Sequence, residues 1–327
     1  MALRLVDRLL NLLIAIGYFA ISGIGILYFL INEKFEWIPE TAIELMRDKD
    51  LIERPEAKRC ADCHKAIYDS WKKSRHSISW TSETYLEASE NHTKEKCLAC
   101  HIPESVTGEK PQPRLDRRDE GIHCISCHFI NNKMNGPYDL VAPPHPTYRN
   151  SEYVRSSFCG SCHQKTYKEW KTTTTEDTCQ HCHMPRVRAR LTQKFGLNLL
   201  HKKKWVGDHR FLHGEISEKD ILMEASFQEN FFNVSLLNKT VPHNLPTADN
   251  GDPRLYLYIK FFNHAGKTVD NAKEIIAPQQ ETALPYKIKL HYRYRLFDKI
   301  AYAEIQLQYK PAWSKEKETV LIKTVHQ

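Results

Sequence analysis

Cys124–Ile125–Ser126–Cys127–His128 is one of five Cys-x-x-Cys-His strings, which together contain all ten cysteines of this 327-residue chain. The other four strings begin at Cys60, Cys97, Cys159 and Cys179. In this pattern two thiols can add to the vinyl groups of a haem, and the next histidine can bind its iron as the proximal ligand. Chance would give about 0.02 such strings in a chain of this composition. The strings therefore predict five covalently bound haem c groups.

We number the expected haems 1 to 5 in chain order. The expected covalent attachment sites are the paired cysteines Cys60, Cys63, Cys97, Cys100, Cys124, Cys127, Cys159, Cys162, Cys179 and Cys182. The expected proximal ligands of the haem iron are the histidines that close the strings, His64, His101, His128, His163 and His183.

Zinc and disulfides are the alternative explanations of paired cysteines. Zinc ribbons combine Cys-x-x-Cys pairs two by two, so five pairs would leave one pair over. Zinc also gives no reason for a histidine after every second cysteine. Two residues between half-cystines form a tight, strained loop, and a chain of this length needs no cross-links to build a core. Haem attachment is the preferred interpretation.

The N-terminal segment predicts a membrane anchor. Leu9 to Ile31 carries no charged residue and would be about 34 Å long as a helix, enough to cross the hydrocarbon layer of a bilayer. A cleaved signal peptide would have a shorter apolar region and a small-residue cleavage site. Arg4 and Arg8 precede the run, so we expect the N-terminus in the cytoplasm. The chain would cross the bacterial inner membrane once, with the rest in the periplasm.

The formal charge of +7 is weak support for a nucleic-acid partner. Each haem brings two propionates, so five haems would contribute roughly −10 and reverse the sign. The sequence has no glycine-rich phosphate loop, and its basic segment at 201–204 is short. We therefore expect no nucleic-acid binding.

The chain divides into four expected zones. Residues 1–31 hold the cytoplasmic tail and the transmembrane helix at 9–31, and residues 32–55 form a stalk in which Pro39 could start a helix that Pro55 stops. The haem zone runs over 56–216, with about one haem per 25 residues between the first and last string. So little protein per cofactor implies that porphyrin faces supply most of the buried apolar surface. The fourth zone, 217–327, has no cysteine.

Segments rich in β-formers occupy this last zone, and the turn residues Ala265–Gly266 and Asp298 separate some of them. The expected strands cover 255–261, 286–292, 303–309 and 320–323. The predicted fold class is thus a mainly α and irregular multihaem cytochrome domain, a C-terminal antiparallel β-sandwich and one N-terminal transmembrane helix.

An iron with two protein ligands can only exchange electrons, whereas an iron with one protein ligand has a free position for a small molecule. His76 follows the first string by one expected helix, and His145 lies in a stiff proline-rich loop. His209 and His213 would share one face of a helix at i and i+4. His243 lies where the β zone would return to the haems. These five histidines are the candidate distal ligands of the haem iron.

The other histidines are weaker candidates. His92 and His123 stand shortly before strings, and His201 lies in a solvated lysine-rich run. His181 is inside its own string, where the geometry argues against ligation. The expected positions for His264, His291 and His326 are on the surface of the β zone.

These residues resemble the multihaem cytochrome c-554 family, which is related in haem arrangement to hydroxylamine oxidoreductases. The similarity rests on Trp71–Lys72 and His76 after the first string, on Gly121–Ile122 before the third, and on Phe158 before the fourth. The segments 178–185, 209–211 and 243–247 look like parts of larger relatives with a C-terminal β-domain.

The resemblance implies periplasmic electron transfer through stacked haem pairs, with His76 and His145 as distal ligands. It also implies that haem 2, above His101, has no distal protein ligand. This chain departs from the tetrahaem members of the family in its fifth string and its retained anchor.

Two functions follow as expectations. The first is a membrane-anchored electron conduit between a quinol-linked membrane partner and periplasmic redox proteins, alone or within a larger complex. The second is a catalytic cytochrome that acts on a small nitrogen or sulfur compound at a five-coordinate haem. The sequence has no Cys-x-x-Cys-Lys string, which excludes the lysine-ligated site of ammonia-forming nitrite reductases. Electron transfer without catalysis is the preferred hypothesis.

Overall fold

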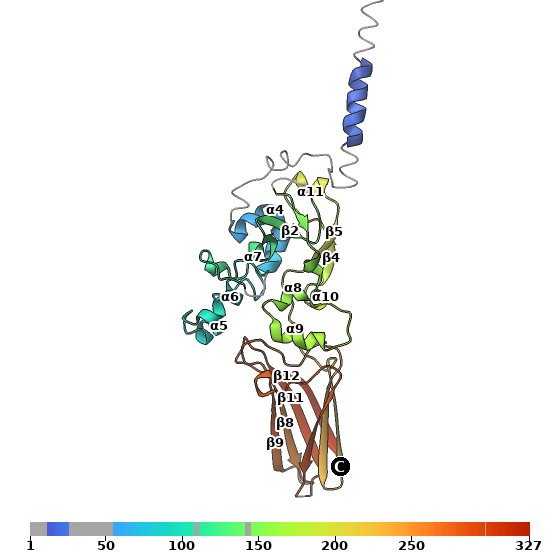
Figure 1. The fold of residues 1–327 in the computed structure, drawn as a ribbon. Helices are drawn as coiled ribbons and strands as arrows, with labels where there is room; N and C mark the ends of the chain where they lie inside the picture. The colour runs from blue at the N-terminus through green and yellow to red at the C-terminus, as the bar shows by residue number, and fades with distance from the viewer. Residues whose placement is uncertain (1–11, 26–54, 108–110, 141–144, 298) are drawn as a thin grey trace, which may run out of the picture.

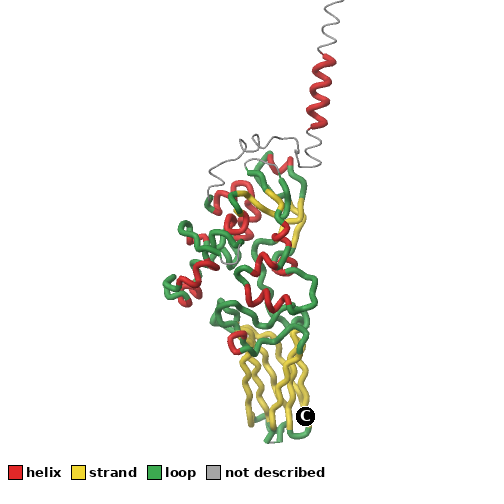
Figure 2. Tube along the Cα trace, viewed as in Figure 1, coloured by secondary structure: helices red, strands yellow, loops and turns green. Residues whose placement is uncertain are grey.

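The computed structural model describes residues 12–25, 55–107, 111–140, 145–297 and 299–327. Short helices and loops form a haem region, and long antiparallel strands form a β region at its lower end (Figures 1 and 2). The predicted order, a helical and irregular haem region followed by antiparallel sheets, is confirmed.

Residues 12–25 form a helix whose apolar side chains are mostly exposed. Within the part of the chain that the structure describes, no helix has both the length and the apolar character needed to cross a bilayer. The two ends of the anchor predicted at 9–31, and the stalk before Pro55, lie outside the described residues.

The haem region is built from short helices joined by turns. The α-helices are α4 (Ala57–Trp71), α5 (Glu83–Ala88), α6 (Leu98–His101), α7 (Cys124–His128), α8 (Ser157–Gly160), α9 (Gln164–Lys171), α10 (Cys179–His183) and α11 (Leu197–Leu200). The 3-10 helices are η1 (Glu95–Cys97), η2 (Arg118–Glu120) and η3 (Ser151–Val154). The short strands are β1 (Phe129–Ile130), β2 (Lys133–Gly136), β3 (Tyr148–Arg149), β4 (Arg186–Ala189) and β5 (Lys204–Gly207).

The β region contains two antiparallel sheets. The strands β6 (Ile221–Gln228), β7 (Phe231–Asn238) and β10 (Lys289–Arg295) pair in the order β10-β7-β6. The strands β8 (Arg254–Phe262), β9 (Thr268–Ile276), β11 (Tyr302–Lys310) and β12 (Glu318–His326) pair in the order β12-β11-β8-β9. The 3-10 helix η4 (Pro278–Gln280) follows β9.

The two sheets share one apolar core because alternate residues of their strands point inward. Every second residue of β7 is buried, and its Phe232 meets Phe261 of β8 edge-on at a centroid distance of 5.3 Å. Burial of these side chains explains how a region without cofactor sites holds together.

The predicted strands at 255–261, 303–309 and 320–323 lie within β8, β11 and β12. Gly266 makes the β8–β9 turn with a φ of +71°, as its position predicts. The predicted start of the strand at 286–292 is wrong. Tyr286 forms only an isolated bridge with Asn238, Lys287 lies in a turn, and β10 begins at Lys289. The predicted turn residue Asp298 lies outside the described residues. Strands β6, β7 and β9 were not predicted.

Candidate haem-binding site

Each Cys-x-x-Cys-His string coincides with a short helical turn. The strings of haems 3 and 5 form α7 and α10, which both end at the string's histidine. In the longer α4, His64 interrupts the helix with φ −107° and ψ 42°. Cysteines three apart on one turn point to the same side. All ten cysteines are free, so each pair is available for thioether bonds.

Backbone carbonyls orient four of the five proximal histidines. The Nδ1 atoms of His64, His101 and His128 lie 2.7, 2.6 and 2.8 Å from the carbonyl oxygens of Leu191, Ser79 and Asn135. The Nδ1 of His183 contacts the carbonyl of Leu212 in the same way. A carbonyl can only accept, so each Nδ1 donates its hydrogen. The lone pair on Nε2 is then available to iron.

His163 is the exception, because its Nδ1 faces a carboxylate. The Asp249 Oδ2 atom lies 3.7 Å from it. The same carboxylate accepts the backbone N–H of Lys165 at 2.5 Å through Oδ1. Burial pulls the pKa of Asp249 upward, but His163 and the Lys165 N–H outweigh it and hold the pKa below its usual value. A charged oxygen is therefore next to one proximal ligand.

Four of the five candidate distal histidines lie opposite a proximal histidine. The ring centroids are 6.1 Å apart for His64 and His145, 6.3 Å for His163 and His76, 6.3 Å for His128 and His209, and 6.5 Å for His183 and His243. An imidazole nitrogen about 2 Å from a metal, with its ring centre about 1.2 Å behind, puts two trans imidazole centroids roughly 6.4 Å apart. The spacing of all four pairs fits an iron between two imidazoles.

The distal histidines have the protonation that ligation requires. Nδ1 of His209 lies 2.9 Å from the Gly207 carbonyl, and Nδ1 of His243 lies 2.9 Å from that of Asn244, so both donate there and leave Nε2 free. Burial lowers the pKa of His76 to about 3 and those of His145, His209 and His243 to about 4. All four rings are neutral at pH 7, and the neutral ring is the form that binds iron.

Gly121 brings the His76 segment against the third string. Its φ is +60°, and an added Cβ would lie 2.5 Å from the His76 carbonyl oxygen and 2.5 Å from the Ser79 hydroxyl. The next residue, Ile122, donates its N–H to the His76 carbonyl at 3.0 Å. The distal candidate for haem 4 is thus fixed by the loop that precedes the string of haem 3.

His213 does not face a proximal histidine. Its ring lies against Trp313, at a centroid distance of 4.4 Å. The helix expected to carry His209 and His213 on one face is wrong, because this segment forms a turn and irregular backbone in which Phe211 has a φ of +50°. Phe211 instead contacts His76 at 4.3 Å and His209 at 5.8 Å. This aromatic bridge between two distal candidates was missed in the sequence.

His101 has a different neighbourhood from the other proximal histidines. Tyr85 stacks on its ring at 4.0 Å. His92 stacks on Trp80 at 3.7 Å instead of facing His101. In the described parts of the chain, no histidine ring lies opposite His101 in the manner of the four pairs.

Thiol contacts between strings show which haem positions are neighbours. Thiols of different strings lie close enough for each to shift the pKa of the other, and this is so for Cys60 with Cys124, Cys100 with Cys162 and Cys159 with Cys179. The attachment sites of haems 1 and 3, of haems 2 and 4, and of haems 4 and 5 are therefore adjacent. Phe211 adds the link between the distal sides of haems 3 and 4.

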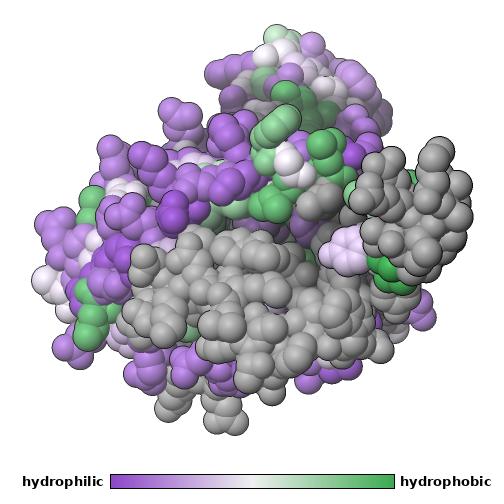
Figure 3. Space-filling model, turned by 90° about the horizontal axis from the view of Figure 1, so that it is seen from above, coloured by the Kyte–Doolittle hydropathy of each residue, from purple (hydrophilic) through white to green (hydrophobic). Residues whose placement is uncertain are grey.

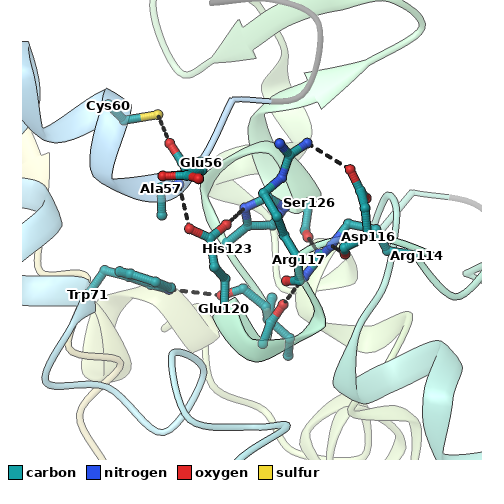
Figure 4. A network of polar contacts seen from close by, with 12 residues as sticks. Glu56, Ala57, Cys60, Trp71, Arg114, Asp116, Arg117, Glu120, His123 and Ser126 are labelled. Carbon is teal, nitrogen blue, oxygen red and sulfur yellow. Dashed lines mark hydrogen bonds and ion pairs between the residues drawn. The ribbon is translucent and has the colours of Figure 1, made fainter.

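A buried polar network holds the first and third strings together (Figure 4). Glu120 accepts the backbone N–H of Ala57 at 2.8 Å and pairs with the fully buried His123 at 2.9 Å. Trp71 of α4 donates its indole N–H to the Ile122 carbonyl at 2.8 Å. His123 is thus bound to a carboxylate instead of facing a proximal histidine.

Arg114, with 1% of its surface exposed, lies at the centre of this network. Its guanidinium donates to one hydroxyl and four carbonyls, those of Ser126 (3.0 Å), Pro103 (3.1 Å), Asp116 (2.9 Å), Arg117 (2.8 Å) and Gly121 (2.8 Å). These acceptors lie after the second string, before the third and within the third. One side chain therefore joins the two strings.

Part of this sequence is similar to sequences of known proteins. Residues 59–129, which contain the first three strings, match the family model for cytochrome c554 and c-prime. Cytochrome c-554 from Nitrosomonas europaea is 29% identical over 98 residues, a match that covers 25% of this chain and 40% of that protein's length. The predicted resemblance to the cytochrome c-554 family is confirmed for this segment.

A similarity of fold extends over most of the chain. The crystal structure of a penta-haem cytochrome c552 from Thermochromatium tepidum aligns with a TM-score of 0.60 at 17% identity, over 84% of this chain and 100% of that one. This chain is a multihaem c-type cytochrome. Its similarity to the penta-haem protein concerns the fold alone, and its haem positions rest on its own strings and histidine pairs.

Asp249 is expected to lower the reduction potential of haem 4 in this cytochrome. A carboxylate beside Nδ1 makes the His163 imidazole a stronger donor, which favours ferric iron. In Asp249→Asn the amide oxygen can keep the Lys165 contact while the charge is lost, and we expect the potential to rise by on the order of 50 mV. A redox titration monitored by EPR measures this shift.

The matched control is Asp252→Asn, on the same loop, whose carboxylate pairs with Arg254 at 2.7 Å. It should leave the potential of haem 4 unchanged. An unchanged or lower potential in Asp249→Asn, with all haems retained, would contradict the role of this carboxylate.

Proposed function

We propose that this cytochrome transfers electrons between a quinol-linked partner in the membrane and redox proteins of the periplasm. The observation that supports this most is the set of four facing histidine pairs. An iron held between two imidazoles has no free position for a substrate and exchanges electrons only. The contacts between neighbouring strings favour passage of electrons along the whole set.

The proposal includes attachment to the bacterial inner membrane through residues 9–31, with the haem and β regions in the periplasm. The uncharged run and the basic residues before it support this orientation. It also includes five haem c groups, one for each string, because each string supplies two free thiols and an adjacent histidine.

The protein's own residues perform three tasks in this function. Carbonyl contacts fix four of the five proximal imidazoles in one tautomer and orientation. Burial keeps the distal rings neutral. Phe211 contacts both His76 and His209 and would hold these two distal candidates of haems 4 and 3 at a fixed distance. The bound haem groups supply the one-electron chemistry.

A second function is favoured by the surroundings of His101. Without a facing histidine, haem 2 would keep an open coordination position, where a small nitrogen or sulfur compound could bind. Tyr85 stacks on the His101 ring itself, so it lies on the proximal side and would not fill this position. This second candidate is catalysis at haem 2, in addition to electron transfer through the others.

Protein-film voltammetry of the haem-loaded protein, combined with EPR, separates the two functions. We expect four low-spin ferric signals, one high-spin signal from haem 2, and a reversible redox wave that added nitrite, hydroxylamine or sulfite leaves unchanged. A catalytic current with any of these compounds would contradict a purely conducting role and establish the second. High-spin signals from two or more haems would contradict the facing pairs.

A further inference from the structure

The segment 186–207 has an unusual combination of charge and exposed apolar surface. It contains seven lysine and arginine residues and no aspartate or glutamate. Strands β4 and β5 pair antiparallel at its two ends, with Arg186 opposite Gly207 and Ala189 opposite Lys204. Helix α11 lies between them, at the end of the haem region farthest from the β region (Figure 1). We call this segment the basic hairpin.

Large apolar side chains of the basic hairpin face outward. Phe195 is 92% exposed and Leu199 68% exposed near the tip, while Val187 and Trp205 are 58% and 50% exposed on the strands. Arg188 lies over the Trp205 ring at 5.5 Å. The face seen from above shows apolar side chains exposed among hydrophilic ones (Figure 3). Aromatic and aliphatic groups surrounded by cations are typical of a surface that enters the headgroup layer of a membrane.

The basic hairpin is tied directly to the haem 1 site. The Leu191 carbonyl accepts from Nδ1 of His64 at 2.7 Å. Gln193 donates its N–H to the Cys63 carbonyl at 2.7 Å, and its side chain accepts the N–H of Ala66 at 3.0 Å. Phe195 follows two residues later. Whatever binds the tip of the hairpin is therefore next to the first haem string.

We propose that the basic hairpin docks on the surface of a bilayer that contains anionic phospholipids and thereby holds haem 1 at the membrane. This inference rests on the proposed function and names the haem that faces the membrane. Seven cations without a single anion fit a layer of anionic headgroups. Phe195 and Leu199 can bury apolar surface among the lipid chains, which adds to the electrostatic attraction of the headgroups. The apolar helix 12–25 lies beyond the same end of the haem region (Figure 1).

The test uses the full-length, haem-loaded protein in nanodiscs, because residues 9–31 could hold the chain at any bilayer. Discs of zwitterionic lipid alone are compared with discs that contain one third anionic phosphatidylglycerol, and amide hydrogen exchange is measured by mass spectrometry. We expect peptides from 194–205 to exchange at least about tenfold more slowly on the anionic discs, and 0.5 M salt to reverse the difference. Equal exchange on the two discs would overturn the proposal.

Matched variants separate lipid contact from other causes of protection. Phe195→Ser combined with Leu199→Ser, and separately Lys194→Gln combined with Lys203→Gln, should each abolish the protection. Leu115→Ser and Phe297→Ser are controls, since these side chains are 80% and 81% exposed outside the hairpin, and both should keep it. Loss of protection in the controls would overturn the assignment.

The haem count of each variant tests the other possible occupant of the apolar side chains, haem 1 itself. If Phe195→Ser with Leu199→Ser lost a haem or changed the haem 1 EPR signal, the side chains would belong to the haem site and the proposal would be wrong. The exchange measurement needs neither a redox partner nor electron transfer. Failure of the docking surface and failure of the electron-transfer function therefore give different results.

Discussion

His209→Ala is expected to convert haem 3 from a low-spin to a high-spin centre. His209 faces His128 at a ring distance of 6.3 Å and is buried and neutral, with Nδ1 bound to the Gly207 carbonyl. Its removal would leave one protein ligand on that iron. Loss of a strong donor to ferric iron should raise the reduction potential by on the order of 0.1 V. EPR of the oxidised protein and a potentiometric titration measure both changes.

His213→Ala is the matched control, four residues along the same segment. His213 packs on Trp313 and faces no proximal histidine, so the spin states of all haems should stay as they are. If His209→Ala kept every low-spin signal, or if His213→Ala removed one, the assignment of these two histidines would be wrong. Added imidazole should restore the low-spin signal of His209→Ala.

Arg114→Ala should destabilise the haem region by on the order of 3–5 kcal/mol. The substitution removes five buried hydrogen bonds. The Pro103 and Arg117 carbonyls keep a second donor, the Ser126 hydroxyl and the Glu120 N–H, whereas the carbonyls of Asp116 and Gly121 lose the guanidinium as their donor. These acceptors belong to the segments around the second and third strings, so those segments should separate first. Denaturant unfolding, followed through the Soret band and tryptophan fluorescence, measures the loss.

Two further variants make this result specific. Arg114→Lys keeps the charge but has fewer donors and no planar fork, so most of the stability should still be lost. Arg155→Ala removes an exposed arginine that pairs with Glu152, and its effect should stay within about 0.5 kcal/mol. A loss below about 1 kcal/mol in Arg114→Ala would mean that this network does not hold the strings together.

Local sequence patterns were sufficient to predict the multihaem character of the chain and several strands, and the individual haem attachment residues stay a prediction. A Cys-x-x-Cys-His string contains within five residues all the groups that attach a haem. In 255–261 and 303–309 the apolar residues at every second position form the buried face of β8 and β11. The edge strand β9 escaped prediction because most of its residues are polar and only Ile276 is buried. In strand β6 the residues at every second position are exposed, and Glu224, Ser226 and Gln228 among them are polar. The segment is therefore less apolar than β8.

The partners of the string histidines depend on tertiary structure and were harder to predict. His76, His145, His209 and His243 were chosen for their local context, and the structure places each of them opposite a proximal histidine. The i, i+4 spacing alone suggested a helix for His209 and His213. The left-handed backbone at Phe211 instead turns the chain, so that the His209 ring faces His128 and the His213 ring packs on Trp313.

Two other residues had no signal in the sequence. Asp249 reaches His163 from a loop between β7 and β8, 86 positions away in the chain. Arg114 looks like any surface arginine until the loops fold around it. These contacts depend on how distant segments pack, so they cannot be predicted from a local sequence period or motif.

The intact mass of the mature protein, made in a host with its own haem-attachment machinery, tests the central claim most directly. We predict a mass that exceeds the bare polypeptide by five haem groups, with each thiol pair blocked against alkylation. A smaller excess, or any pair of string cysteines that still reacts with an alkylating reagent, would contradict the claim that every string holds a haem.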